Sequence, residues 1–125
     1  EGELVALVKG LARAFGAQAK VVYQRGYAST VNDRPFSDRV REDAALVVGE
    51  KHVVEPRRTM GGEDMSYFLQ RVPGCFFFLG TRNPDRKIES PHHSPTFDLE
   101  EEALPVGVEV LTRVVTRYLS EKARD

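Results

Sequence analysis

Two neighbouring histidines, His92 and His93, lie in a short polar segment at residues 91–102. Pro91 and Pro95 stand on either side of them and restrict the backbone of this turn. An imidazole on a stiff loop can bind a metal ion or act as a general base. If the protein is an enzyme, these residues predict that its chemistry takes place at this turn. The alternative is that the pair belongs to a solvated turn without a catalytic role.

The residues after the histidines predict the start of a long helix. Asp98 offers a side-chain oxygen to a helix N-terminus, and Glu101 follows three residues later, which is the form of a capping box. Pro105 predicts a kink or a local helix start. An apolar stripe at helical spacing then runs through Leu104, Val108, Leu111, Val115, Tyr118 and Leu119. We therefore expect the turn to be held at the head of this last helix.

A hydrolase triad built from the turn is a weaker alternative. It would combine His92, His93 and Asp98 with a serine nucleophile. Ser94 is too close in sequence to reach a neighbouring imidazole in the geometry that a triad needs. The residues of the turn therefore do not predict a serine hydrolase.

A glycine pair, Gly61 and Gly62, precedes a second stretch that could carry function. Glu63 and Asp64 follow it and are predicted to fall in the first turn of a helix. The stretch superficially resembles a phosphate-binding loop, but two carboxylates would repel an anion there, and the lysine of the nucleotide-binding loop is absent. These residues argue against nucleotide binding.

The remaining pattern alternates helices with short strands. The predicted helices cover about residues 2–15 and a segment capped by Ser37 or Asp38 that ends at Gly49, and the predicted strands cover residues 19–24, 52–55 and 75–79. Turn-forming residues between 27 and 36 mark a candidate domain boundary. Such alternation predicts an α/β fold with helices packed on a sheet.

Composition excludes several classes of protein. The 125 residues carry 18 basic and 19 acidic side chains, and the two signs are interspersed, so we expect no nucleic-acid partner and no membrane surface. The single cysteine, Cys75, precedes an apolar run and is predicted to be buried. The opening residues lack the charged-then-apolar pattern of a signal peptide, so we expect the cytoplasm as the default compartment. Because the sequence begins with Glu1 rather than Met, we expect it to be a piece of a longer protein.

Several motifs, taken together and in order, resemble one known family. They are residues 61–68 (GGEDMSYF), Pro73-Gly74 with the following apolar run to Leu79-Gly80, residues 93–101 (HSPTFDLEE) and residues 103–107 (ALPVG). The chain is similar along nearly its whole length to the zinc-dependent amidohydrolase and aminoacylase metallopeptidases. That family includes hippurate hydrolases, indole-acetyl-amino-acid hydrolases and thermophilic carboxypeptidases.

The resemblance implies a two-domain architecture. Residues 1–30 would be the last helix-strand unit of an inserted α/β lid, which often mediates dimerisation. Residues 31–125 would be the C-terminal part of a catalytic domain built on a zinc-peptidase-like sheet with flanking helices. Exposed apolar edges, chiefly residues 75–79 and the last helix, would then make the chain a homo-oligomer or bind it to the missing N-terminal part.

The resemblance also implies a reaction, the hydrolysis of N-acyl amino acids or peptides by metal-activated water at a paired zinc centre. His93 matches the family's late metal-binding histidine, whereas His92 is not carried over. Glu63 and Asp64 match a motif near the metal, where we expect them to contact the ligands of the ion or to serve the structure. No catalytic residue is assigned, because the general base and the other ligands come from N-terminal segments in this family.

Two functional hypotheses follow. The first is the C-terminal part of a metal-dependent amidohydrolase, which is inactive alone because one histidine cannot hold a dinuclear centre. The second is a non-catalytic α/β module for dimerisation or binding that keeps the family's shape. The sequence does not indicate the acyl group, the amino acid or the metal.

Overall fold

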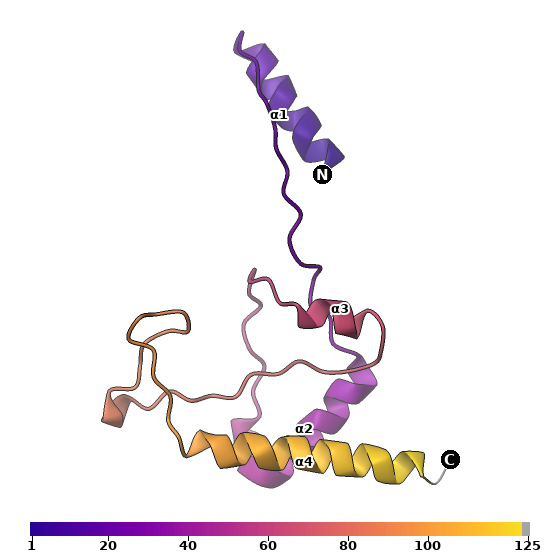
Figure 1. Cartoon of the computed structure of the whole chain (residues 1–125), viewed down its shortest axis with the longest axis vertical. Coiled ribbons are helices and arrows are strands. Elements are labelled where there is room, and N and C mark those ends of the chain that lie inside the picture. Colours follow the sequence, from indigo (N-terminus) through magenta and orange to yellow (C-terminus); the bar gives the residue numbers. More distant parts are fainter. Residues whose placement is uncertain (124–125) are drawn as a thin grey trace.

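The computed structural model describes residues 1–123, which contain four α-helices and two short 3-10 helices (Figure 1). In chain order these are α1 (Gly2–Ala14), α2 (Arg34–Val48), η1 (Glu50–His52), α3 (Met65–Leu69), η2 (Pro84–Arg86) and α4 (Ala103–Lys122). Within this part of the chain, no helix is both long and apolar enough to cross a membrane.

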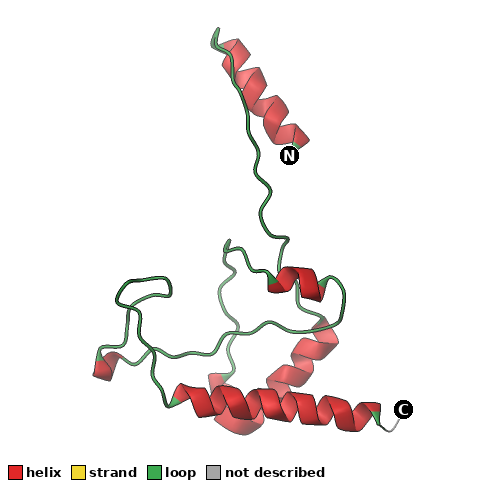
Figure 2. Ribbon diagram, in the orientation of Figure 1, coloured by secondary structure: helices red, strands yellow, loops and turns green. Residues whose placement is uncertain are grey.

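The segments that were predicted to be strands are not paired in the structure. Among residues 1–123 no strand is assigned, and the one ladder contact is an isolated antiparallel bridge between Asn83 and Ile88 (Figure 2). His52 lies in η1 rather than in a strand. A strand exists only by its hydrogen bonds to a neighbour, so the α/β sheet of the expected fold stays a prediction.

Helix α1 lies apart from the other helices, at the far end of an extended segment (Figure 1). This segment runs back along α1, and an ion pair of 2.5 Å joins Arg25 to Glu1. Leu4, Leu7, Leu11 and Phe15 are exposed, and α1 has no buried residue. Val5, Val8 and Ala12 are half-buried, so the apolar face of α1 is only partly covered in the part of the chain that is described.

Helix α2 begins earlier than the sequence predicted. The cap is Asp33, whose Oδ1 accepts a hydrogen bond of 2.9 Å from the Phe36 backbone N–H, so the prediction of Ser37 or Asp38 as the cap was wrong. Ser37 instead donates its hydroxyl to the Asp33 carbonyl. Gly49 ends the helix at φ 82°, a conformation that favours glycine, as expected.

Helices α2 and α4 pack against each other and form the main tertiary contact. Val40 of α2 and Val110 of α4 are buried, and the rings of Phe36 and Tyr118 lie 5.9 Å apart. Arg117 of α4 forms ion pairs with Glu42 and Asp43 of α2 and with Glu121 of its own helix. The hydrogen bond to Glu42, followed by that to Glu121, raises the pKa of the Arg117 guanidinium.

The start of α4 also differs from its prediction. The helix begins at Ala103, and the residue before it, Glu102, makes no side-chain cap. The carboxylate of Asp98 accepts a hydrogen bond from the backbone N–H of the next residue, Leu99, so the predicted Asp98–Glu101 capping box does not form. A local start near Pro105 is confirmed, since proline is tolerated in a first helical turn.

A short contact joins the residues before α2 to the apolar run after α3. The Asn32 side-chain amide both donates to the Phe76 carbonyl and accepts from the Phe76 N–H, each at 2.8 Å. The Asp33 N–H donates to the carbonyl of Gly74. Cys75 is half-buried beside this contact rather than fully buried as predicted. An asparagine side chain here takes the hydrogen bonds that a neighbouring strand would otherwise take.

Candidate metal-binding turn

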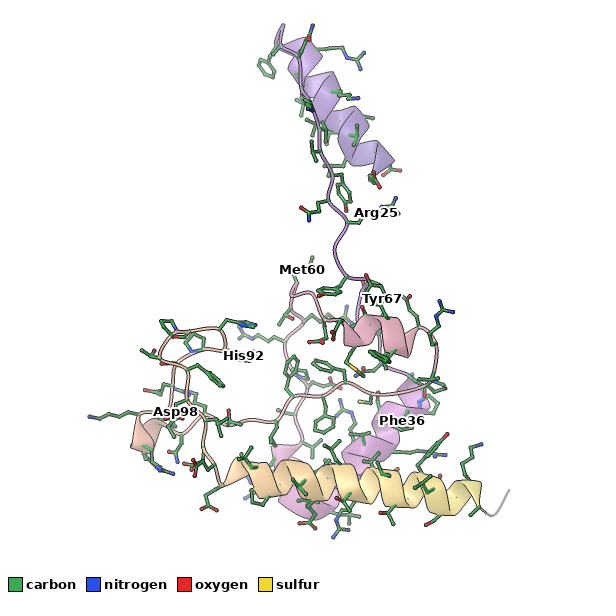
Figure 3. All side chains as sticks on the ribbon, viewed as in Figure 1. Arg25, Phe36, Met60, Tyr67, His92 and Asp98 are labelled. Carbon is green, nitrogen blue, oxygen red and sulfur yellow. The ribbon has the colours of Figure 1, made fainter. Side chains whose placement is uncertain are left out.

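The turn at residues 91–97 projects from the side of the molecule that faces away from α4 (Figure 3). Its base leads through residues 98–102 into the start of α4. His92 and His93 are both exposed at the end of this loop. The position of the histidines ahead of the last helix is therefore as the sequence predicted.

The two imidazole rings lie against each other. Their centroids are 4.2 Å apart with the planes tilted by 30°, and the His92 ring also contacts the Phe97 ring at 5.2 Å. His93 has a φ of 65°, in the left-handed region that non-glycine residues rarely adopt. Among residues 1–123 neither ring has a hydrogen bond or an ion pair, so the ring nitrogens are available to a ligand.

Hydroxyl groups hold the loop in shape from within. Thr96 Oγ1 lies 2.8 Å from Ser90 Oγ and 3.0 Å from Ser94 Oγ, and the Ser94 oxygen also accepts the Thr96 backbone N–H. The Ser94 N–H donates to the carbonyl of Pro91. Local hydrogen bonds of this kind fix a short turn, which is how a loop can present a ligand side chain in one orientation.

Glu100 fastens the base of the turn to the preceding loop. Its backbone N–H donates to the Thr81 carbonyl, and its carboxylate accepts hydrogen bonds from the Asn83 amide and, at 2.6 Å, from Arg86. The bond from Asn83, with a further contribution from the positive charge of Arg86, lowers the pKa of Glu100 below its ordinary value of 4.5. The carboxylate is therefore held in its charged form.

Replacing Glu100 with Gln is expected to lower stability at pH 7 and to lower it less in acid. Because the pKa of Glu100 is depressed in the folded state, its contribution is present above the ordinary value of 4.5 and is lost as the pH falls through the folded value. Urea unfolding at pH 7 and below pH 4 measures this difference, with the exposed Glu101→Gln as the control. An equal difference between wild type and Glu100→Gln at both pH values would contradict it.

The glycine pair and its two acids lie at the start of α3 rather than within its first turn. Glu63 is half-buried, and its Oε1 accepts the Met65 N–H at 3.4 Å, whereas Asp64 is exposed and caps the helix without a side-chain hydrogen bond. A Cβ at Gly62 would lie 2.8 Å from Cδ2 of Tyr27, so only glycine fits under that ring. Tyr27 in turn contacts Tyr67 of α3, edge to face at 5.9 Å.

A complete metal site is not formed by these residues. Among residues 1–123 no group of three or more histidine, cysteine, aspartate or glutamate side chains could hold a metal ion. Neither Glu63 nor Asp64 joins His93 in such a group. Since a zinc site takes three or four protein ligands, residues 1–123 do not form a complete zinc site by themselves.

The hydrogen bonds of Glu100 are the feature of the site that the sequence did not reveal. Asn83 lies 17 residues before Glu100, so no local pattern pairs the two side chains. Arg86 is 14 residues from Glu100. The one signal in the sequence is the Asn83-Pro84 start of a turn, which does not indicate which acid the loop contacts.

Comparison with known proteins gives one family and a set of hydrolases. The sequence profile described as "Peptidase family M20/M25/M40" matches residues 3–117. An IAA-amino acid hydrolase of Arabidopsis thaliana (ILR1-like 4) is 36% identical over 95 residues, which are 76% of this chain and 22% of that protein. Thermostable carboxypeptidase 1 of Saccharolobus solfataricus is 35% identical over 102 residues, 81% of this chain and 25% of that protein.

A third relative covers the whole chain. The N-acetyldiaminopimelate deacetylase of Anoxybacillus flavithermus is 30% identical over 125 residues, 100% of this chain and 32% of that protein. The chain thus spans about a third or less of the length of these relatives. No solved structure matches the chain.

Proposed function

Because this chain belongs to peptidase family M20/M25/M40, we propose that it forms the C-terminal part of a metal-dependent hydrolase that cleaves the amide bond of N-acyl amino acids or peptides. The names of the relatives support this substrate class, since they include an IAA-amino acid hydrolase, a carboxypeptidase and a deacetylase. The cytoplasm is the expected compartment.

One observation carries the proposed role of the chain. The His93 imidazole has no hydrogen-bond or ion-pair partner among residues 1–123, and it contacts only the ring of His92. The loop that carries it is held by its own hydroxyl groups and by Glu100. We assign His93 as the single metal ligand of this chain, with zinc as the proposed ion. A bound divalent ion of this kind supplies Lewis-acid activation of water. His92 covers one face of the His93 ring, so its role is to position its neighbour.

Glu63 and Asp64 are proposed to act near the metal without binding it. The Glu63 carboxylate is already engaged by the Met65 N–H, and Gly62 under the ring of Tyr27 fixes where this pair of acids lies. Both acids are assigned to shaping the wall of the site or to holding other ligands by hydrogen bonds.

The division into domains is likewise proposed. Residues 1–30 would be the end of a lid and residues 31–125 part of the catalytic domain. The position of α1, which lies apart from the other helices at the end of an extended segment, supports a boundary of this kind (Figure 1). The contact of Asn32 with Phe76 then ties the first residues after the boundary to the catalytic part.

Association through exposed apolar surface is part of the proposal. Phe78 is 67% exposed, and Leu104, Val108, Leu111, Val115 and Leu119 of α4 are all exposed. A monomeric soluble protein rarely exposes a contiguous surface of this kind. We propose that a second copy, or the remaining part of a longer polypeptide, covers it.

The hydrolase proposal is tested with the full-length gene product that contains this sequence. N-acetyl-L-methionine and hippurate are suitable substrates, with product formation measured before and after treatment with a metal chelator. We expect hydrolysis that the chelator removes and that added zinc restores. Hydrolysis that persists in chelator, or no hydrolysis of any N-acyl amino acid in the presence of zinc, would overturn the proposal and favour the non-catalytic module.

The 125-residue polypeptide by itself is expected to show no turnover. One imidazole cannot hold a catalytic ion, and residues 1–123 contain no group of three ligands. The measurement is the same assay on the purified polypeptide with zinc added, with the full-length product as the positive control. Turnover above the rate of buffer, removed by chelator, would show that the polypeptide assembles a site that its described residues do not form.

A further inference from the structure

A polar groove lies where α2 packs against α4, beside the ion pairs that join the two helices. Its volume is about 350 Å³. Asp43 of α2 lines it on one side, and α4 supplies the other lining residues, which are Thr112, Arg113, Thr116, Arg117 and Ser120. None of these residues belongs to the apolar stripe of α4, so a partner that covers the stripe does not have to cover this groove.

Asp43 brings to the groove a carboxylate oxygen that lacks a donor. The residue is only 5% exposed, and its Oδ1 lies 3.4 Å from Nη1 of Arg117. Its Oδ2 is buried and has no hydrogen-bond partner within residues 1–123. A buried charged oxygen without a donor is costly, because it has lost its water without gaining a bond in return. A donor from a ligand in the groove removes that cost.

The charges around the groove favour a cation. The ion pairs here involve four carboxylates and three guanidinium groups, namely Glu42, Asp43, Glu109 and Glu121 with Arg39, Arg113 and Arg117. One negative charge is therefore left over, and both arginines that line the groove already have acidic partners. Among residues 1–123 no group of three histidine, cysteine or acidic side chains could hold a metal ion, so an organic cation suits the groove better.

The acceptors in the groove match a primary ammonium group, which has three N–H donors and no acceptor. Oδ2 of Asp43 is the first acceptor. The hydroxyls of Thr116 and Ser120 are two more, since neither has a hydrogen-bond partner among residues 1–123. These two residues are four apart on α4, so their side chains lie on the same face of the helix. A guanidinium group has five N–H donors in a fixed plane and would leave more of them without an acceptor.

We propose that the groove between α2 and α4 binds a small molecule through a primary ammonium group. Asp43 accepts one N–H of the ligand, and Thr116 and Ser120 accept the other two. The ligand contacts both helices, so its binding stabilises the folded state. The groove contains no residue of the histidine turn, and the inference does not depend on the proposed hydrolase function.

The test titrates the full-length gene product with ethylammonium and with tetramethylammonium, and binding is followed by ligand-observed NMR. We expect saturable binding of ethylammonium but not of tetramethylammonium, which has the same charge and no N–H donor. Asp43→Asn keeps the shape of the side chain and removes its charge. It should weaken the binding of ethylammonium about 10- to 100-fold, because a charge-assisted hydrogen bond is lost.

A second variant keeps the test decisive if Asp43→Asn lowers the stability of the fold. Thr116→Val combined with Ser120→Ala removes two exposed hydroxyls, leaves every ion pair in place and should weaken binding about 10-fold. Glu109→Gln is the matched control, since Glu109 is an exposed acid of α4 that pairs with Arg113 but does not line the groove. Its affinity should stay within about 2-fold of wild type.

Three results would overturn the inference. They are the absence of saturable binding to the wild-type protein, equal binding of the two ammonium ions, and an unchanged affinity in the variant that lacks the hydroxyls of Thr116 and Ser120. A loss in Glu109→Gln as large as that in Asp43→Asn would show that the ligand responds only to the general negative charge of this surface, which would also overturn it.

Discussion

Replacing His93 with Ala in the full-length gene product is expected to remove most of the bound metal and to lower kcat/KM by more than about 100-fold. The loss should exceed the roughly 10- to 100-fold loss that follows when a residue that only hydrogen-bonds to a metal ligand is removed. The reason is that His93 is the one imidazole of the turn that we assign to the ion. Metal content of the purified variant and hydrolysis of N-acetyl-L-methionine measure the two effects.

His92 provides a matched control for this substitution. It lies beside His93 in the same exposed turn, with ring centroids 4.2 Å apart, and it also contacts Phe97. His92→Ala removes a packing partner of His93 but no assigned ligand, so we expect a loss of less than about 10-fold, smaller than that for a metal ligand. Equal losses in the two variants would contradict the assignment of His93 alone, and a larger loss in His92→Ala would reverse it.

The backbone at His93 needs its own control. Its φ of 65° is strained for any residue with a Cβ, at a cost of about 1 kcal/mol. His93→Gly removes the ring but relieves this strain. A loss of metal that His93→Ala and His93→Gly share therefore comes from the missing imidazole. Recovery of metal binding in His93→Gly alone would show that the shape of the turn, rather than the ring, is what matters.

Local signals in the sequence predicted the helices well. Helix α1 was predicted for residues 2–15 and covers Gly2–Ala14, and Gly49 follows α2 as expected. These elements depend on apolar spacing and on a glycine at the C-terminal end, which are properties of neighbouring residues. Strand predictions depend in addition on a partner, and within residues 1–123 the extended segments find none.

The error at the start of α2 shows how three candidate N-cap residues compete. Asp33, Ser37 and Asp38 are all acceptable N-cap residues. Asp33 prevails because its carboxylate receives the Phe36 N–H, and Pro35 then falls in the first helical turn, where its missing N–H costs nothing. Treating Asp33 as only a turn former concealed this arrangement.

The candidate site was less predictable from local sequence than the helices were. Which histidine matters came from the resemblance to a family, because from local sequence His92 and His93 are equivalent. Geometry distinguishes them only in part, through the left-handed backbone at His93. The anchoring of the turn by Glu100 was out of reach, because Asn83 and Arg86 belong to a separate loop that only the folded chain brings near.

The second large expected effect is a loss of stability when Val110 of helix α4 is replaced. Val110 is the buried residue of the helix and lies outside the apolar stripe. The stripe predicted from the sequence is exposed, whereas Val110 is 3% exposed. Val110→Asp places an unpaired charge in a core whose buried apolar residues are Val40, Ile88 and Val110. We expect the free energy of unfolding of the chain to fall by about 3 kcal/mol or more, enough to lose the packing of α2 on α4.

Val108→Asp on the same helix separates folding from association. Val108 is 66% exposed and belongs to the apolar stripe. A charge there stays in water, so the urea midpoint should change little. The variant should sediment as a smaller species than wild type, because we propose that a partner covers the stripe. Equal loss of stability in Val108→Asp and Val110→Asp would mean that the stripe packs inside the fold of a single chain and is not an association surface. Unfolding in Val110→Asp with unchanged sedimentation in Val108→Asp would place the association surface elsewhere, with α1 the next candidate since its apolar face is also exposed.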